Sequence, residues 1–107
     1  MFPMVVTNEW SKDGPAKVVW LMNLLGRHPW LKDRITEAIG YAGNRWVLYT
    51  NRGVKLLLSN DADRELKFLS RLQKRYAILD RTVRQVELRI PGKAAVRMKA
   101  DYPAAML

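Results

Sequence analysis

Residues 45–76 read RWVLYTNRGVKLLLSNDADRELKFLSRLQKRY and carry the strongest structural signals in the chain. Two apolar runs, 45–49 and 54–58, flank the polar loop Asn51-Arg52-Gly53, where glycine can supply the positive φ that tight turns often need. They predict a β-hairpin. Residues 62–79 then carry apolar side chains at every third or fourth position, which is typical of a helix packed on a core: Ala62, Leu66, Leu69, Leu72, Tyr76 and Leu79.

The ends of this helix carry charges that suit its dipole. We expect Ser59 or Asn60 to cap its N-terminus. The first turn holds acidic residues and the last turn basic ones: Asp61, Asp63, Glu65, Lys74 and Arg75. Because carboxylates stabilise a helix N-terminus, this pattern favours a structural role over a metal site.

The chain before the hairpin predicts a short extended opening, a helix and a strand. Asp13-Gly14-Pro15 is typical of a helix start, and Gly26 ends the helical spacing that follows. Residues 29–31 predict one further turn. Residues 35–41 predict a strand, and the segment from Gly40 to Asn44 predicts the turn that connects it to the hairpin.

The C-terminal part predicts a second strand pair. Val86, Leu88 and Ile90 alternate with polar residues, so we expect them on one face of a strand. Pro91-Gly92 fits the twist of a hairpin poorly, so the loop there is expected to be wider than two residues. The next strand repeats the alternation, with Ala94, Val96 and Met98 opposite Lys93, Arg97 and Lys99.

The order of these elements predicts an α+β fold. We expect an antiparallel β-sheet with two main helices packed on one face and the C-terminal strand at the sheet edge. A length of 107 residues fits one domain spanning 1–107. No stretch approaches the roughly 20 apolar residues of a membrane span, so we expect any anchor to lie outside this chain.

The residue types present exclude several kinds of chemistry. The chain has no cysteine, which excludes disulfides and thiolate metal sites. Its one histidine, His28, follows a helix end, where we expect it to contact terminal carbonyls rather than act as a base or ligand. No serine lies in a nucleophile elbow, and no glycine loop for phosphate is present. We therefore predict a protein that is not an enzyme and uses no cofactor and no metal.

The net charge favours an acidic partner. The chain has 19 Lys+Arg and 10 Asp+Glu, a net charge of +9, which suits nucleic acid, anionic lipid or an acidic protein. A small basic nucleic-acid-binding module is the main alternative, because residues 40–43 have GxxG spacing. That segment has no basic residue between its glycines, however, and a turn explains it better. Three aromatic residues also pattern as core, namely Trp20, Trp46 and Tyr76, whereas Trp10 and Trp30, expected to be more exposed, lie in no basic cluster.

The basic residues are dense in the C-terminal strand pair. Residues 84–99 contain five basic side chains and one acid, Glu87, a net charge of +4. One interpretation is a solvated outer face whose charges discourage edge aggregation. The other is an edge strand that a partner extends, with the basic side chains selecting an acidic partner. The pattern supports both equally.

Taken together, these motifs resemble the β domain of the FtsQ/DivIB bacterial cell-division proteins, of the FtsQ type. The similarity lies in the strand at Arg45-Trp46, the turn at 51–53, the helix from Ala62 to Tyr76 and the strand Val86-Glu87-Leu88-Arg89, in this order. It covers nearly the whole chain, and the order and spacing of the motifs carry more information than any one of them.

The resemblance implies a non-enzymatic scaffold of the divisome. It implies a periplasmic domain of a single-pass inner-membrane protein from a Gram-negative bacterium, with the POTRA domain and the transmembrane helix outside 1–107. The implied partners are FtsB and, through it, FtsL, bound by β-strand addition to the last strand. No small-molecule substrate is implied, nucleic acid is disfavoured, and membrane association is expected only through an anchor outside this chain.

The same resemblance assigns the partner-binding residues. Arg89 matches a family arginine that meets an acidic residue of FtsB, and Arg45 matches a second such arginine. Ile90 and Met98 stand where well-studied members carry aromatic residues, and Gly92 where they carry serine; backbone pairing tolerates such changes. The expected partner-binding set, in which Ala94 to Met98 form the extended strand, is Arg45, Arg89, Ile90, Gly92, Ala94, Ala95, Val96, Arg97 and Met98.

Overall fold

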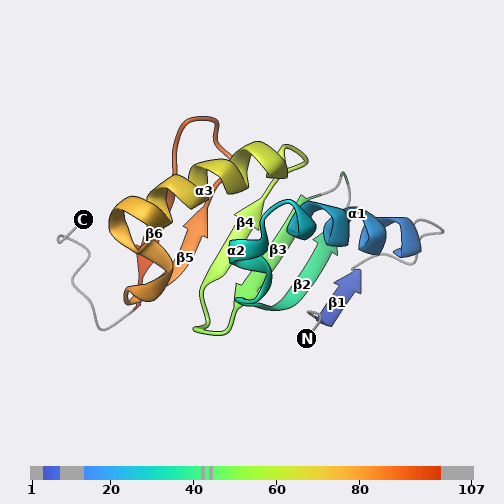
Figure 1. The fold of residues 1–107 in the computed structure, drawn as a ribbon, viewed down its shortest axis with the longest axis horizontal. Helices are drawn as coiled ribbons and strands as arrows, with labels where there is room; N and C mark the ends of the chain where they lie inside the picture. The colour runs from blue at the N-terminus through green and yellow to red at the C-terminus, as the bar shows by residue number, and fades with distance from the viewer. Residues whose placement is uncertain (1–3, 8–13, 42, 44, 100–107) are drawn as a thin grey trace.

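The computed structural model describes residues 4–7, 14–41, 43 and 45–99 of the chain. The described residues form a sheet with helices on one of its faces (Figure 1). In chain order the elements are β1 (Met4–Thr7), α1 (Gly14–Gly26), α2 (Pro29–Lys32), β2 (Ile35–Tyr41), β3 (Arg45–Thr50), β4 (Lys55–Leu58), α3 (Ala62–Tyr76), the 3-10 turn η2 (Ile78–Asp80), β5 (Val83–Glu87) and β6 (Ala95–Met98).

The six strands of the sheet lie in the order in which they occur in the chain, from β1 to β6. The pairs β1–β2 and β4–β5 are parallel, and the other three are antiparallel. Each parallel pair needs a crossover, which α1 with α2 and α3 provide. Both crossovers advance in the same direction along the sheet. Because such crossovers are almost always right-handed, they place their helices on the same face, as Figure 1 shows.

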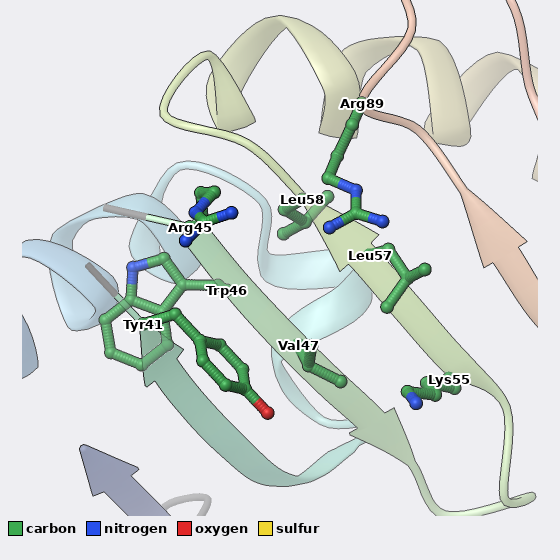
Figure 2. Close-up of a pocket in the computed structure, with 8 residues that line it drawn as sticks. All are labelled: Tyr41, Arg45, Trp46, Val47, Lys55, Leu57, Leu58 and Arg89. Carbon is green, nitrogen blue, oxygen red and sulfur yellow. The ribbon is translucent and has the colours of Figure 1, made fainter. Parts of the chain in front are cut away.

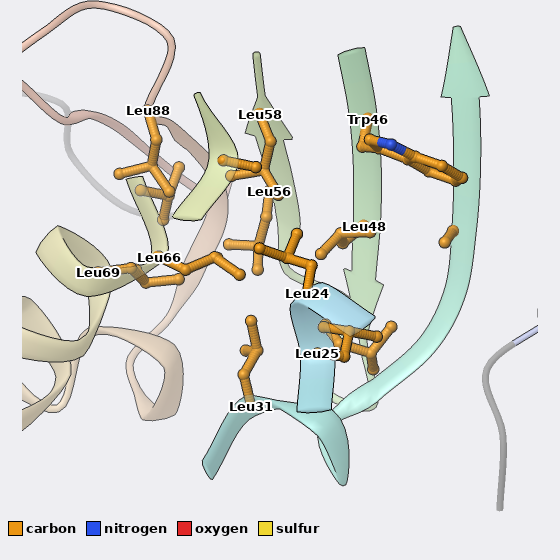
Figure 3. Packing of buried hydrophobic residues seen from close by; sticks show 14 of the residues in the cluster. Leu24, Leu25, Leu31, Trp46, Leu48, Leu56, Leu58, Leu66, Leu69 and Leu88 are labelled. Atoms are coloured by element: carbon orange, nitrogen blue, oxygen red, sulfur yellow. The ribbon is translucent and has the colours of Figure 1, made fainter. Parts of the chain in front are cut away.

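The core fills the space between this face and the helices (Figure 3). Leucines of α1 and α3 meet leucines of the central strands, and each fully buried leucine contributes about 1.5–3 kcal/mol. Trp46 on β3 stacks on Trp20 of α1 with ring centroids 6.2 Å apart. The fully buried residues of this layer include Leu21, Leu24, Leu25, Leu48, Leu56, Leu58, Leu66 and Leu69.

Where the structure describes them, the expected elements before residue 60 are confirmed; Asp13, expected at the start of the first helix, lies outside the described residues. Helix α3 differs in detail from its prediction. Its N-cap is Asp61 rather than Ser59 or Asn60, and its side chain makes no capping hydrogen bond. The helix ends at Tyr76 because Ala77 adopts a left-handed conformation with φ of 50°. Tyr76 was expected in the core. It is exposed in the structure, because it is the last residue of the helix and lies at the edge of the buried stripe.

The C-terminal strand pair is also confirmed, with one correction. β5 ends at Glu87, and the chain turns at Pro91-Gly92, where Gly92 has φ of 72°. The alternation therefore stops at Leu88, and Ile90, expected on the apolar face, is 52% exposed in the loop. Val96 on β6 packs against the core as expected. The fold is α+β, with a mostly antiparallel sheet, the helices on one face and the C-terminal strand at the edge.

Candidate protein-docking site

The candidate site is a hollow on the face of the sheet that the described helices leave uncovered (Figure 2). Alternation along β3 and β4 sends Trp46 and Leu58 toward the core and Arg45 and Leu57 to the opposite face. The hollow has a volume of about 320 Å³. Its lining comes from β2, β3, β4 and the loop that follows β5: Tyr41, Arg45, Trp46, Val47, Lys55, Leu57, Leu58 and Arg89.

The floor and the rim of the hollow differ in chemistry. Val47 and Leu57 are each 8% exposed although they lie on the helix-free face, because the longer side chains around them shield them. Arg45, Lys55 and Arg89 supply positive charge at the rim. An apolar floor bordered by cations suits an acidic side chain that has apolar neighbours.

The strand register explains why Arg45 and Arg89 share this hollow despite their separation in sequence. Trp46 lies opposite Leu58 in the β3–β4 pair, and Leu57 lies opposite Glu87 in the β4–β5 pair. Continuing this register brings Arg45 and Arg89 to the same end of the sheet, on either side of β4. Two strand spacings separate their backbones, roughly 10 Å, and Figure 2 shows Leu58 between them.

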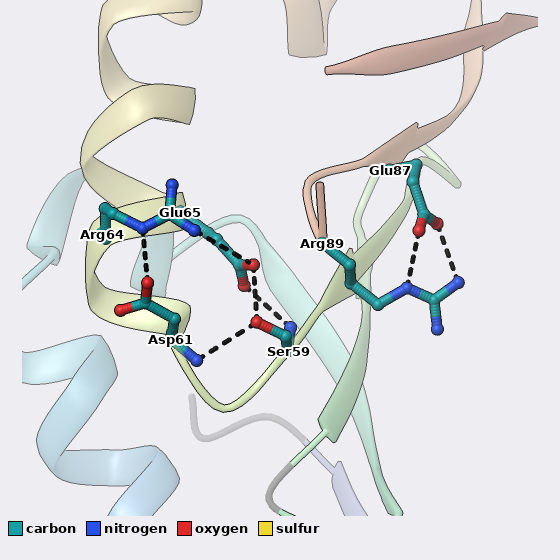
Figure 4. A network of polar contacts seen from close by, with 6 residues as sticks. All are labelled: Ser59, Asp61, Arg64, Glu65, Glu87 and Arg89. Atoms are coloured by element: carbon teal, nitrogen blue, oxygen red, sulfur yellow. Dashed lines mark hydrogen bonds and ion pairs between the residues drawn. The ribbon is translucent and has the colours of Figure 1, made fainter. Parts of the chain in front are cut away.

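Arg89 is held by Glu87 from the same strand face (Figure 4). The Nε and Nη2 groups of Arg89 donate hydrogen bonds of 2.7 and 2.9 Å to the two carboxylate oxygens of Glu87. This bidentate contact raises the pKa of Arg89 above its ordinary value. It also fixes the guanidinium beside the hollow while leaving its Nη1 group for another acceptor.

The edge of the sheet lies two strands beyond β4, on the side of the hollow where Arg89 lies. β6 pairs with β5 on one side, and no strand of the described residues pairs with its other side. Along β6, Ala95 and Arg97 are exposed, while Val96 and Met98 pack against the core. Every second residue of an edge strand directs its N–H and C=O groups outward, so β6 offers backbone groups to an incoming strand.

The structure brings two of the expected residues together in the hollow and places the others in the loop after β5 and along β6. Arg45 and Arg89 line the hollow, Ile90 and Gly92 lie in the exposed loop, and Ala94 precedes β6, which begins one residue later than expected. Sequence reasoning missed Lys55 and Tyr41 as lining residues. The sequence showed that Lys55 and Tyr41 alternate with apolar residues of their strands. It did not show the register that brings three strands together.

The described residues form no catalytic or metal-binding arrangement that we can identify. His28 is buried, and its Nε2 lies 2.8 Å from Oδ1 of Asp63 on α3. This corrects the expectation that it contacts terminal carbonyls, because the packing of α3 against the α1–α2 junction supplies a carboxylate. No group of three or more His, Asp or Glu side chains able to hold a metal occurs in the described part of the chain.

The tryptophans that the structure describes do not form a platform for stacking bases. Trp46 is buried and Trp20 stacks on it, while Trp30 is partly buried against the core; Trp10 lies outside the described residues. Of the GxxG segment, Gly40 and Tyr41 lie inside β2, and Gly43 lies between β2 and β3 with φ of 73°. These placements give the nucleic-acid alternative no stacking site among the described tryptophans.

Comparison with known proteins agrees with this geometry. Residues 2–94 match the protein family described as "Cell division protein FtsQ/DivIB, C-terminal". The chain belongs to the FtsQ/DivIB family. It is also 30% identical over 92 residues to "Cell division protein FtsQ" of Rhizobium meliloti (strain 1021), an alignment that covers 85% of this chain and 30% of the relative.

The FtsQ/DivIB match covers both arginines of the hollow and ends one residue before β6. The chain spans about a third of the length of the curated relative that it matches. The family is one of cell-division scaffold proteins that interact with other division proteins. Among the residues that the structure describes, no helix is long and apolar enough to cross a membrane.

Proposed function

We propose that this chain is a non-enzymatic docking domain of a cell-division scaffold, folded as a single unit. Its partner is FtsB, which binds by adding a β-strand to β6 and brings FtsL with it. We further propose that the domain works in the periplasm as part of a single-pass inner-membrane protein of a Gram-negative bacterium. The observation that carries the proposal is the unpaired edge of β6 beside a cation-rimmed hollow.

Backbone pairing at β6 supplies affinity that does not depend on side-chain identity. β6 is short, with four residues from Ala95 to Met98. Its inward side chains, Val96 and Met98, anchor it to the core, so it is held as a template for the added strand. A short basic edge of this kind resists pairing with arbitrary strands, and so favours a partner that also satisfies the charges.

The hollow supplies that selectivity. A carboxylate of the partner placed between Arg45 and Arg89 meets guanidinium groups from both sides of β4. The apolar floor of Val47 and Leu57 excludes water beneath it, which strengthens the charge interaction. Ile90 and Gly92 lie in the loop between Arg89 and β6 and border the path of the partner chain from the hollow to the edge.

The proposal is tested by titrating the chain with the C-terminal periplasmic segment of FtsB from the same organism. Arg89→Glu should weaken binding about tenfold or more, because it replaces the attraction of a carboxylate by repulsion. Arg52→Glu is the matched control, since Arg52 is an exposed arginine in the turn at the other end of β3. Binding that is absent at high micromolar concentration, or equal losses in both folded variants, would contradict the proposal.

A further inference from the structure

The outer surface of the helix layer has a composition that the proposed docking site does not explain. On α1 the exposed positions follow helical spacing and carry no charge: Ala16, Val19, Asn23 and Gly26. Val19 is 59% exposed. The one charged residue of α1, Lys17, turns its Nζ to the carbonyl oxygen of Tyr41, 3.0 Å away. An uncharged, largely apolar strip is unusual on the outer face of a surface helix.

The outer face of α3 is strongly basic. Its exposed cations recur every third or fourth residue, opposite the stripe that packs on the core. In the first half of the helix, Arg64 pairs with Asp61 and Lys67 with Asp63. In the second half, no carboxylate of the described residues forms an ion pair with the cations there: Arg71, Lys74 and Arg75.

Aromatic rings accompany these unpaired cations. The guanidinium of Arg71 lies 5.7 Å from the ring centroid of Phe68, and that of Arg75 lies 5.5 Å from the centroid of Tyr76. Tyr76 is 46% exposed. Tyrosine beside basic residues is the composition found where a protein meets the headgroup region of a bilayer.

The two helix faces belong to one surface. α1 and α3 cover the same face of the sheet in Figure 1, and their exposed residues therefore point away from it on the same side. The end of α1 is tied to the start of α3 through Asp63, which accepts a hydrogen bond from Arg27 at 3.2 Å and lies 2.8 Å from His28.

We propose that this outer face of α1 and α3 docks on an anionic lipid bilayer. The cations of α3 contact the headgroups, and the apolar strip of α1 enters the boundary between headgroups and acyl chains. A nucleic acid or an acidic protein would use the cations but has no need of an exposed valine on an uncharged helix face. This contact goes beyond the expectation that the chain meets a membrane only through an anchor elsewhere, and it is independent of the β6 site.

The test is sedimentation of the 107-residue chain with vesicles of phosphatidylglycerol, compared with vesicles of phosphatidylcholine. We expect binding to the anionic vesicles that weakens as salt is added. The double variant Arg71→Gln/Lys74→Gln should lower the affinity about 25-fold, because each cation near the surface contributes about fivefold. Arg52→Gln/Lys93→Gln removes the same charge from two exposed loop positions and should leave binding within about twofold.

Variants of Val19 test the apolar half of the surface. Val19→Ser should weaken vesicle binding about fivefold and Val19→Leu should strengthen it, in proportion to the methylene groups inserted. Circular dichroism confirms that each variant is folded. The proposal is overturned if the chain does not sediment with anionic vesicles, if both double variants lose binding equally, or if Val19→Ser leaves it unchanged, since the last result means that the exposed side of α1 does not enter the bilayer.

Discussion

Gly40 is a residue at which the backbone of the sheet packs directly against a buried aromatic ring. A Cβ atom at this position would lie 3.0 Å from Cη2 of Trp46, whose ring is buried and stacked on Trp20. The backbone of β2 therefore forms one wall of the slot that holds the indole. The glycine that seemed to belong to a turn motif in the sequence has a packing role in the structure.

Gly40→Ala is expected to destabilise the protein by about 1–3 kcal/mol, because the added methyl group overpacks a rigid aromatic slot. Urea unfolding monitored by tryptophan fluorescence measures the effect. Gly26→Ala provides the control, since a Cβ there would meet nothing within 4 Å, and its effect should stay within about 0.5 kcal/mol. Equal losses for the two variants would mean that the slot is not rigid.

Asp63 joins three basic side chains at the start of α3. Its hydrogen bond with His28, followed by those with Arg27 and Lys67, lowers its pKa from 3.8 to about 2. Since the folded-state pKa lies below the unfolded value, the stabilisation is present above pH 4 and is lost as the pH falls toward 2. The carboxylate is partly exposed, so we discount the contribution for solvent screening to about 1 kcal/mol.

Asp63→Asn should therefore lower the free energy of unfolding by about 1 kcal/mol at neutral pH and by almost nothing near pH 2. Denaturant unfolding at a series of pH values between 7 and 2 measures both limits. A difference that stays constant across this range would show that the carboxylate charge is not the cause.

At the scale of the elements, the junction between β4 and α3 depends on one buried carboxylate. Glu65 is 1% exposed and accepts hydrogen bonds from the backbone N–H and the hydroxyl of Ser59, at 2.8 and 2.7 Å (Figure 4). From the sequence alone, Glu65 was grouped with Asp61 and Asp63 as an acidic residue at the start of a helix. Only the packing of α3 on the sheet turns it inward, so its different role was not predictable from spacing.

The alternation predicted for β6, with Val96 facing the core and Arg97 facing solvent, can be tested with two variants. Val96→Ser should cost about 1–2 kcal/mol, because Val96 packs against the core. Arg97→Ser, on the exposed side, should change the free energy of unfolding by less than about 0.5 kcal/mol. Thermal unfolding of the two variants compares them, and similar losses would mean that β6 has no fixed inward face.

The sequence predicted most elements, the helices on one face and the C-terminal strand at the edge, but not the register between the strands. Local signals such as Gly26, the Asn51–Gly53 loop and the α3 stripe depend on neighbouring residues, and they located the helices and the hairpin well. Ile90 was placed wrongly because alternation continues in sequence past the point where β5 ends. The candidate site was predicted less completely than the fold, because the hollow depends on the register between β3, β4 and β5. No local sequence pattern encodes that register.

At the scale of the whole molecule, two crossovers share one helix layer and one core. Leucines of α1 and α3 pack on the same central strands, so neither half has a core of its own. We therefore expect residues 1–107 to unfold as a single cooperative domain. Tryptophan fluorescence, which reports on α1 and β3, should give the same transition as far-UV circular dichroism, which reports on all helices. Two separated transitions would contradict the single-domain prediction.

Docking at the β6 edge is most directly measured by backbone amide hydrogen exchange of the 15N-labelled chain, alone and with the FtsB segment. In the free chain, the amides of Ala95–Met98 that bond to β5 should exchange slowly and the outward ones quickly. Addition of the segment should slow the outward amides of β6 and leave those at the opposite edge, in β1, unchanged. Binding that leaves the outward β6 amides unprotected would contradict strand addition at this edge.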